Sequence, residues 1–128
     1  MANGIPRPIR ILIVDDDKTF NRTLEARLAK AGFRVETCFD GASALAAFSA
    51  TRFDLVVLDL VMPTMPGFAV LEEIRKRDAK VPVVVLSMLH QEEDVEKVTK
   101  LGASKYLAKS SPSFMDELVK YAEEVSVS

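Results

Sequence analysis

The fold is decided by residues 11–17, ILIVDDD, where four branched apolar residues run directly into three aspartates. An unbroken apolar run of this length predicts a short strand that is buried on both faces. Further segments rich in β-branched or aromatic residues also predict strands. They are RVETCF at 34–39, LVVL at 55–58, VPVVVL at 81–86 and KYLA at 105–108.

Longer segments with helical periodicity separate these strands and close the chain. They cover residues 18–30, 42–49, 68–77, 92–101 and 113–125. In the first segment, side chains at a spacing of three to four residues form one apolar face that is expected to pack on the sheet. That face consists of Phe20, Leu24, Leu28 and Ala31.

Polar residues and a glycine mark several helix ends. Asp17 and Asp40 precede the first and second helices and are predicted N-caps. Gly32 follows the first helix as a helix-ending glycine, and Ser113 with Asp116 has the spacing of a capping box. Asp17 therefore has a structural explanation that needs no ligand.

Strict alternation of strand and helix favours a parallel sheet with right-handed crossovers. The predicted fold class is α/β: five βα units, (βα)₅, in a three-layer sandwich around a parallel five-stranded sheet. In such sheets ligands bind beyond the carboxyl ends of the strands.

Length and composition indicate one domain. The chain has 128 residues, 48% of them hydrophobic, with 17 Lys and Arg against 19 Asp and Glu. We expect one folded domain over residues 10–125, with tails at 1–9 and 126–128. The single cysteine, Cys38, excludes an intrachain disulfide, and the near-neutral charge argues against direct nucleic-acid binding.

The apolar runs are all too short to span a membrane. The first ten residues, MANGIPRPIR, have no apolar core before a small-residue cleavage site, so we do not expect a secretory signal there. The expected location is the cytoplasm, without membrane contact.

Chemically active residues follow four of the five strands. They are Asp15, Asp16 and Asp17 after the first strand, Asp59 after the third, Ser87 after the fourth and Lys109 after the fifth. If these carboxylates are adjacent in space they repel one another, which either raises the pKa of one of them or demands a cation. Oxygen-only ligands favour a hard divalent ion, and Mg²⁺ suits a site of one or two carboxylates completed by water, phosphate oxygens or a backbone carbonyl such as that of Val61.

Asp59 has no capping role, because no helix begins until several residues after it. Beside a metal and the ammonium of Lys109, its carboxylate could attack phosphorus as a nucleophile, with Ser87 donating a hydrogen bond to the transferred group. The product would be an acyl phosphate. The sequence thus predicts phosphoryl transfer to a carboxylate.

The residues together resemble the receiver domain of two-component response regulators. The resemblance covers about residues 10–125. It rests on ILIVDDD at 11–17, DLVVLDLVMPTMPG at 54–67, VPVVVLS at 81–87 and LGASKYLAK at 101–109, in that order. It implies a flavodoxin-like sheet with strand order 2-1-3-4-5.

The resemblance also implies roles for individual residues. Asp59 would be the phosphoacceptor, and Asp16 and Asp59 would bind Mg²⁺ directly together with the Val61 carbonyl, while Asp15 would bind through water. Ser87 and Lys109 would contact the phosphoryl oxygens.

A switch and a set of partners are implied in the same way. Tyr106 would turn inward as the Ser87 hydroxyl shifts, changing the face formed by the fourth helix, fifth strand and fifth helix. The phosphoryl group would come from a sensor histidine kinase or a histidine phosphotransfer protein. An output domain or protein partner would respond, and the chain would be a phosphoacceptor that assists its own phosphorylation and dephosphorylation, not a turnover enzyme.

The sequence departs from the family pattern at three positions. Ser110 follows Lys109 where the family usually has proline, often after a cis bond, so either strain or a rebuilt loop is expected. Met88 replaces a small residue and could narrow the path to Asp59. Pro66 replaces an acidic residue before Gly67, which we attribute to turn chemistry.

Two other functions fit parts of the sequence. DDDKT at 15–19 also matches the DxDxT signature of haloacid-dehalogenase-like phosphatases, with Asp15 as nucleophile and Asp17 as acid/base. That alternative leaves Asp59 unexplained and lacks a later acidic pair. The other is a receiver-like interaction module that is not phosphorylated, with Met88 or Ser110 disabling the site.

Overall fold

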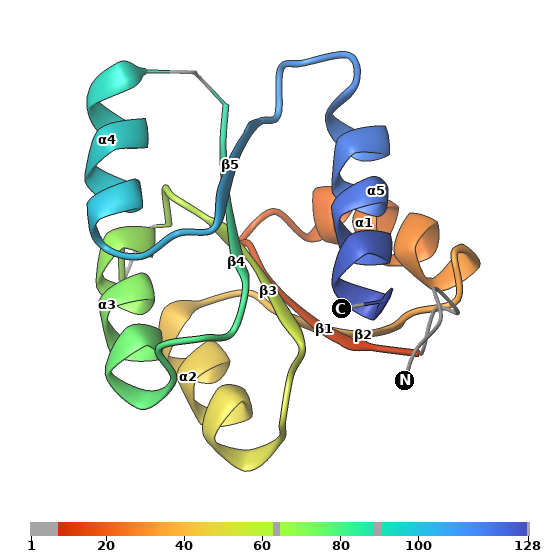
Figure 1. Cartoon of the computed structure of the whole chain (residues 1–128), viewed down its shortest axis with the longest axis horizontal. Helices are drawn as coiled ribbons and strands as arrows, with labels where there is room; N and C mark the ends of the chain where they lie inside the picture. The colour runs from red at the N-terminus through yellow and green to blue at the C-terminus, as the bar shows by residue number, and fades with distance from the viewer. Residues whose placement is uncertain (1–7, 63–64, 89–90, 128) are drawn as a thin grey trace.

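The computed structural model describes residues 8–62, 65–88 and 91–127, and within them five strands alternate with five helices (Figure 1). The strands are β1 Arg10–Val14, β2 Arg34–Cys38, β3 Leu55–Asp59, β4 Val83–Ser87 and β5 Lys105–Ala108. The helices are α1 Lys18–Lys30, α2 Gly41–Ala50, α3 Gly67–Arg77, α4 Glu92–Lys100 and α5 Phe114–Val127. Every predicted element is present, and α1 has the predicted limits.

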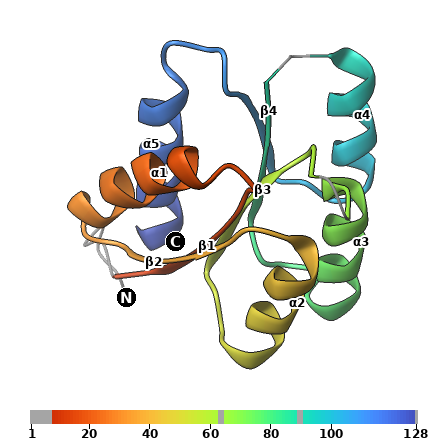
Figure 2. The same ribbon diagram turned by 180° about the vertical axis from the view of Figure 1, so that it is seen from behind.

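All neighbouring strands pair in parallel, in the order β2-β1-β3-β4-β5. Helices α1 and α5 cover one face of the sheet, and α2, α3 and α4 cover the other (Figures 1 and 2). The predicted three-layer (βα)₅ fold and its strand order are therefore confirmed.

Alternate side chains of the central strands enter two apolar layers, as the pleat of a strand requires. Leu12 and Leu58 belong to the layer beneath α2, α3 and α4. Ile13 and Val57 belong to the layer beneath α1 and α5. Since β3 and β4 are buried along their full lengths, the sheet is a rigid support for the residues that follow its strands.

Most of the predicted helix ends are confirmed. Asp17 accepts a hydrogen bond from the Phe20 N–H at 3.0 Å, and Asp40 accepts one from the Ser43 N–H at 2.8 Å. Gly32 ends α1 with a φ of 100°. Ala31 differs from its prediction: it is the C-cap of α1 and is exposed.

The side chains predicted to form a capping box at α5 have other partners. The Ser113 hydroxyl donates to the Glu117 carboxylate at 2.7 Å. Asp116 instead accepts a hydrogen bond from Arg27 of α1 at 2.5 Å. A charged partner on the neighbouring helix offers Asp116 a charge-assisted contact that spacing within α5 does not reveal.

The described structure includes residues on both sides of the predicted domain, 10–125. Ile9 is fully buried, and its carbonyl accepts the Arg34 N–H at 3.0 Å. At the other end Ser126 is buried and α5 continues to Val127. The remaining parts of the predicted tails, 1–7 and 128, lie outside the described residues.

Among the residues that the structure describes, none of the helices combines the length and apolar character needed to span a membrane.

Gly67, the first residue of α3, lies against the backbone at the end of β3. A Cβ atom at this position would fall 2.7 Å from the Leu60 Cα and still closer to the Asp59 carbonyl oxygen. The Gly67 N–H donates to the Leu60 carbonyl at 2.9 Å, while Pro66 precedes the helix in extended conformation. The close approach of these two backbones requires glycine and fixes the path of the chain after Asp59.

We expect Gly67→Ala to lower the free energy of unfolding by about 3 kcal/mol, because backbone atoms must move to admit the methyl group. Gly32→Ala is the control: its Cβ would meet nothing within 4 Å, so only the positive φ is penalised, by about 1–2 kcal/mol. Urea unfolding of both variants measures the difference. Equal losses would contradict the close-approach argument.

Candidate functional site

The carboxyl ends of the strands carry the polar residues predicted from sequence. Asp59 ends β3 and pairs in register with Leu86, while Ser87 ends β4 and pairs with Ala108 of β5. These ends border a cleft of about 530 Å³. The cleft is lined by Asp15, Asp16, Asp17, Asp59, Val61, Ser87, Met88, Gln91, Asp94 and Lys109.

Three carboxylates meet in this cleft. One oxygen from each of Asp15, Asp16 and Asp59 lies within 4.8 Å of the other two. Asp15 and Asp59 are buried, whereas Asp16 is exposed. A set of close oxygen donors, part buried and part open to water, fits the ligand preference of Mg²⁺.

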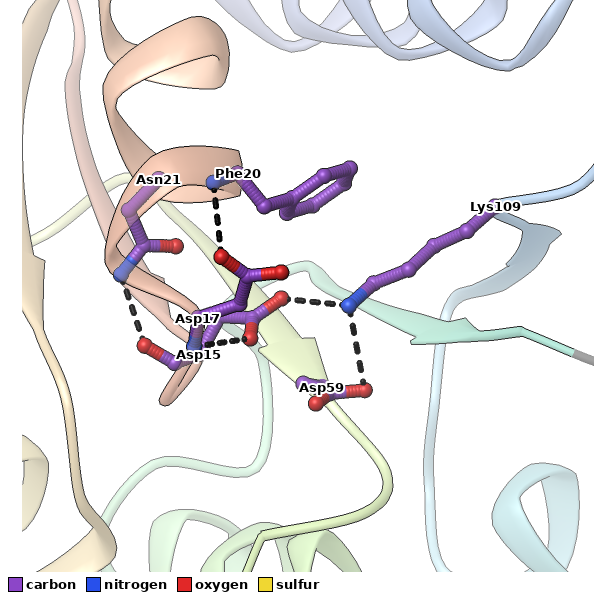
Figure 3. A network of polar contacts seen from close by, with 6 residues as sticks. All are labelled: Asp15, Asp17, Phe20, Asn21, Asp59 and Lys109. Carbon is purple, nitrogen blue, oxygen red and sulfur yellow. Dashed lines mark hydrogen bonds and ion pairs between the residues drawn. The ribbon is translucent and has the colours of Figure 1, made fainter.

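The Lys109 ammonium lies between the two buried carboxylates (Figure 3). Its Nζ is 2.6 Å from Asp15 Oδ2 and 3.6 Å from Asp59 Oδ1. Only 9% of the Lys109 side chain is exposed, so these ion pairs are shielded from bulk water. One cation facing three carboxylates leaves the site with excess negative charge.

The loop after Lys109 is built without a cis bond. The Lys109–Ser110 peptide is trans, and the Lys109 N–H donates to the Ser87 carbonyl at 2.7 Å. The replacement of the usual proline by Ser110 therefore coexists with a lysine that reaches the carboxylates.

Backbone and side-chain contacts hold Asp15 in place. The Asp17 N–H donates to Asp15 Oδ1 at 2.9 Å, and the Asn21 side-chain amide donates to the Asp15 carbonyl at 2.7 Å (Figure 3). Sequence reasoning missed Asn21. The sequence pattern could have indicated it, because Asn21 lies on the same buried face of α1 as Leu24 and Leu28. A polar side chain on such a face needs a hydrogen-bond partner.

Burial raises the pKa of the Asp59 carboxyl to about 6. This value already includes the negative charge of Asp15, which acts in the same direction as burial, and a smaller effect of the same sign from Asp16. The Lys109 ammonium and the Val61 N–H act in the opposite direction. The ionised form of Asp59 is thus disfavoured in the folded protein, and a nearby positive charge would stabilise it.

The other residues singled out in the sequence have distinct environments. Ser87 is buried at the cleft, whereas Val61 and Met88 line it with 72% and 63% of their surfaces exposed. Tyr106 lies outside the cleft lining, on the edge strand β5, half-buried against the apolar layer beneath α2, α3 and α4. Tyr106 is therefore apart from the carboxylates.

The fold and cleft define a class: a doubly wound α/β domain with an acidic site at the carboxyl edge of its sheet. The family model described as response regulator receiver domain matches residues 11–123. The chain belongs to this family of two-component signalling domains.

Curated relatives are transcriptional regulators by name. The transcriptional regulatory protein PrrA of Mycobacterium leprae is 41% identical over 93% of this chain and 50% of its own length. The transcriptional activator protein PfeR of Pseudomonas aeruginosa is 41% identical over 83% of this chain and 34% of its own. The chain spans half or less of the length of these two relatives.

Solved structures show the same fold. The chemotaxis protein CheY4 of Vibrio cholerae superimposes with a TM-score of 0.85 at 30% identity, over 93% of this chain and 99% of that one. NtrX of Brucella abortus gives a TM-score of 0.84 at 31% identity, over 93% of this chain and 27% of that one. The fold therefore occurs both as a whole chain and as part of a longer one.

The raised pKa of Asp59 predicts a pH-dependent stability in metal-free buffer. Between pH 4 and 6 the folded state binds this proton more tightly than the unfolded state does, so the free energy of unfolding falls as pH rises. Asp59→Asn cannot ionise. We expect the free energy of unfolding of the variant to match that of the wild type near pH 4 and to exceed it by on the order of 1 kcal/mol at pH 8. Thermal unfolding in EDTA measures this difference as a higher Tm of the variant at pH 8.

Asp40→Asn serves as the control, because hydrogen bonds from Ser43 lower the pKa of Asp40 and its replacement gives the opposite trend. A wild type more stable than Asp59→Asn at pH 8 would contradict the predicted sign.

Proposed function

We propose that Asp59 accepts a phosphoryl group and that the resulting acyl phosphate switches the domain. One observation carries the proposal: a buried carboxylate with a raised pKa faces an open cleft beside a lysine ammonium and two further carboxylates. The donor would be a sensor histidine kinase or a histidine phosphotransfer protein. The bond from phosphorus to the donor breaks as an Asp59 oxygen bonds to phosphorus.

The acidic cluster supports Mg²⁺ as the cofactor. Asp16 and Asp59 would be direct ligands together with the Val61 carbonyl, and Asp15 would act through water. The bound ion supplies positive charge that neutralises phosphoryl oxygens.

Lys109 and Ser87 would contact the transferred group. The Lys109 ammonium is already 3.6 Å from Asp59, where it can neutralise charge that develops on the phosphoryl oxygens. Ser87, at the end of the next strand, can donate a hydrogen bond from its hydroxyl. Both residues would assist phosphorylation and, with water as the attacking group, dephosphorylation.

We propose that the signal leaves through the face formed by α4, β5 and α5. The register places Ser87 beside Ala108 of β5, two residues after Tyr106. A shift of the Ser87 hydroxyl toward phosphate would make room for Tyr106 to turn inward. The regulator names of the relatives favour an output domain or partner that acts in transcription, with the cytoplasm as the location.

The two alternative functions have weaker support. For the phosphatase alternative, Asp17 would have to act as acid/base, but its carboxylate accepts the Phe20 N–H as the N-cap of α1. For the unphosphorylated module, Met88 would have to block the cleft or Ser110 would have to displace Lys109. The exposed Met88 lines a cleft of about 530 Å³, and Lys109 lies within ion-pair distance of both buried carboxylates. Neither alternative is supported by the relatives.

Intact-mass spectrometry after incubation with acetyl phosphate and Mg²⁺ tests the phosphoacceptor. We expect the mass of one phosphoryl group on the wild type and none on Asp59→Asn. Asp17→Asn is the matched control: asparagine caps a helix as well as aspartate does, so labelling should persist.

Labelling that survives in Asp59→Asn but disappears in Asp15→Asn would favour the phosphatase alternative. A wild type that stays unlabelled, while another receiver domain is labelled in parallel, would favour the interaction module.

A further inference from the structure

The position of Lys109 depends on side-chain contacts more than on its loop. Ser110 leaves the backbone φ free where a proline would fix it, and the peptide between them is trans. The Lys109 N–H bond to Ser87 fixes only the base of the side chain. A lysine stem has many rotamers, so other contacts must select the one that reaches the cleft.

Among the described residues, three groups lie close to the ammonium. Two are the Asp15 and Asp59 carboxylates on the cleft side, and the third is the ring of Phe20, whose centroid lies 4.2 Å from Nζ. This distance is well within the range of a cation–π interaction, which strengthens when the cation is desolvated, as Lys109 is here. Figure 3 shows the ring and the carboxylates around the lysine head.

Phe20 is itself held from two directions. Its N–H donates to Asp17 at 3.0 Å, which fixes its backbone beside the acidic loop. Its ring stacks on Phe114 of α5, with centroids 5.7 Å apart and an interplanar angle of 27°. Phe114 is 5% exposed and belongs to the layer beneath α1 and α5. The ring is therefore a fixed surface.

We propose that Phe20 is a positioning residue whose ring face fixes the ammonium of Lys109 in the cleft. The proposal rests on the proposed function, in which Lys109 contacts phosphoryl oxygens on Asp59. Formation of the acyl phosphate moves the negative charge from the Asp59 carboxylate to the phosphoryl oxygens, whereas the ring of Phe20 stays in the same place beside the cation. The ring thus holds Lys109 on the same side of the cleft before and after transfer.

Phosphorylation kinetics test this role. We expect Phe20→Leu to slow labelling by acetyl phosphate about five- to tenfold and to leave Mg²⁺ affinity near that of the wild type, because Phe20 is not one of the proposed ligands. Phe20→Tyr retains an aromatic face and should restore the rate. Phe68→Leu is the matched control: it removes the ring under Lys97, 4.0 Å from its Nζ, away from the cleft.

Three results would overturn the proposal. The first is a wild-type rate in Phe20→Leu. The second is an equally slow rate in folded Phe20→Leu and Phe20→Tyr. The third is a loss of Mg²⁺ affinity parallel to the loss of rate, which would indicate a general disturbance of the acidic loop.

A second measurement needs no phosphoryl transfer. The ring face over Lys109 should shift the ε-methylene proton resonances of Lys109 upfield in the wild type, in Phe20→Tyr and in Phe68→Leu, but not in Phe20→Leu. Absence of the upfield shift in the wild type would overturn the positioning role. If the wild type is not phosphorylated, the proposed function fails, and this shift still decides where Phe20 holds Lys109.

Discussion

The site depends on the burial of one ammonium between two carboxylates. Lys109 reaches both Asp15 and Asp59 at the end of the sheet, where little water is present to screen the charges. Removal of Lys109 would leave both buried carboxylates without a cation, which is costly. With Asp16 beside them, the acids outnumber the base. The site therefore attracts a further cation, and this excess of negative charge explains why it suits Mg²⁺.

The parallel sheet brings these charges together from distant parts of the chain. Asp15 and Lys109 are 94 residues apart in sequence, yet each follows a strand that ends at the same edge. The register of the strands then fixes how far each group lies along the sheet, as the pairing of Asp59 with Leu86 of β4 shows. The close approach of Gly67 to the backbone of Asp59 and Leu60 places the start of α3 directly against the end of β3.

Sequence alone could predict what sheet topology determines. The strand-end acids, Ser87 and Lys109 were found because the carboxyl ends of parallel strands converge at one edge. Phe20 was predicted as a core residue, and its contact with Lys109 was missed, as was the bond from Asn21 to the backbone of Asp15. Both contacts depend on how α1 rotates and tilts on the sheet. That geometry arises from packing against α5, which local periodicity does not encode.

The serine after Lys109 shows how a family site can keep its geometry after losing a backbone constraint. A proline after Lys109 would restrict the backbone next to it, whereas here the contacts that hold the lysine act at the far end of its side chain, on the ammonium. Phe20 contributes to that restriction and also stacks on Phe114 at the start of α5. A change in the charge facing Lys109 therefore acts on a group in contact with α1 and, through one ring stack, with α5. The same packing that orients the lysine connects the acidic cleft to a helix of the proposed output face.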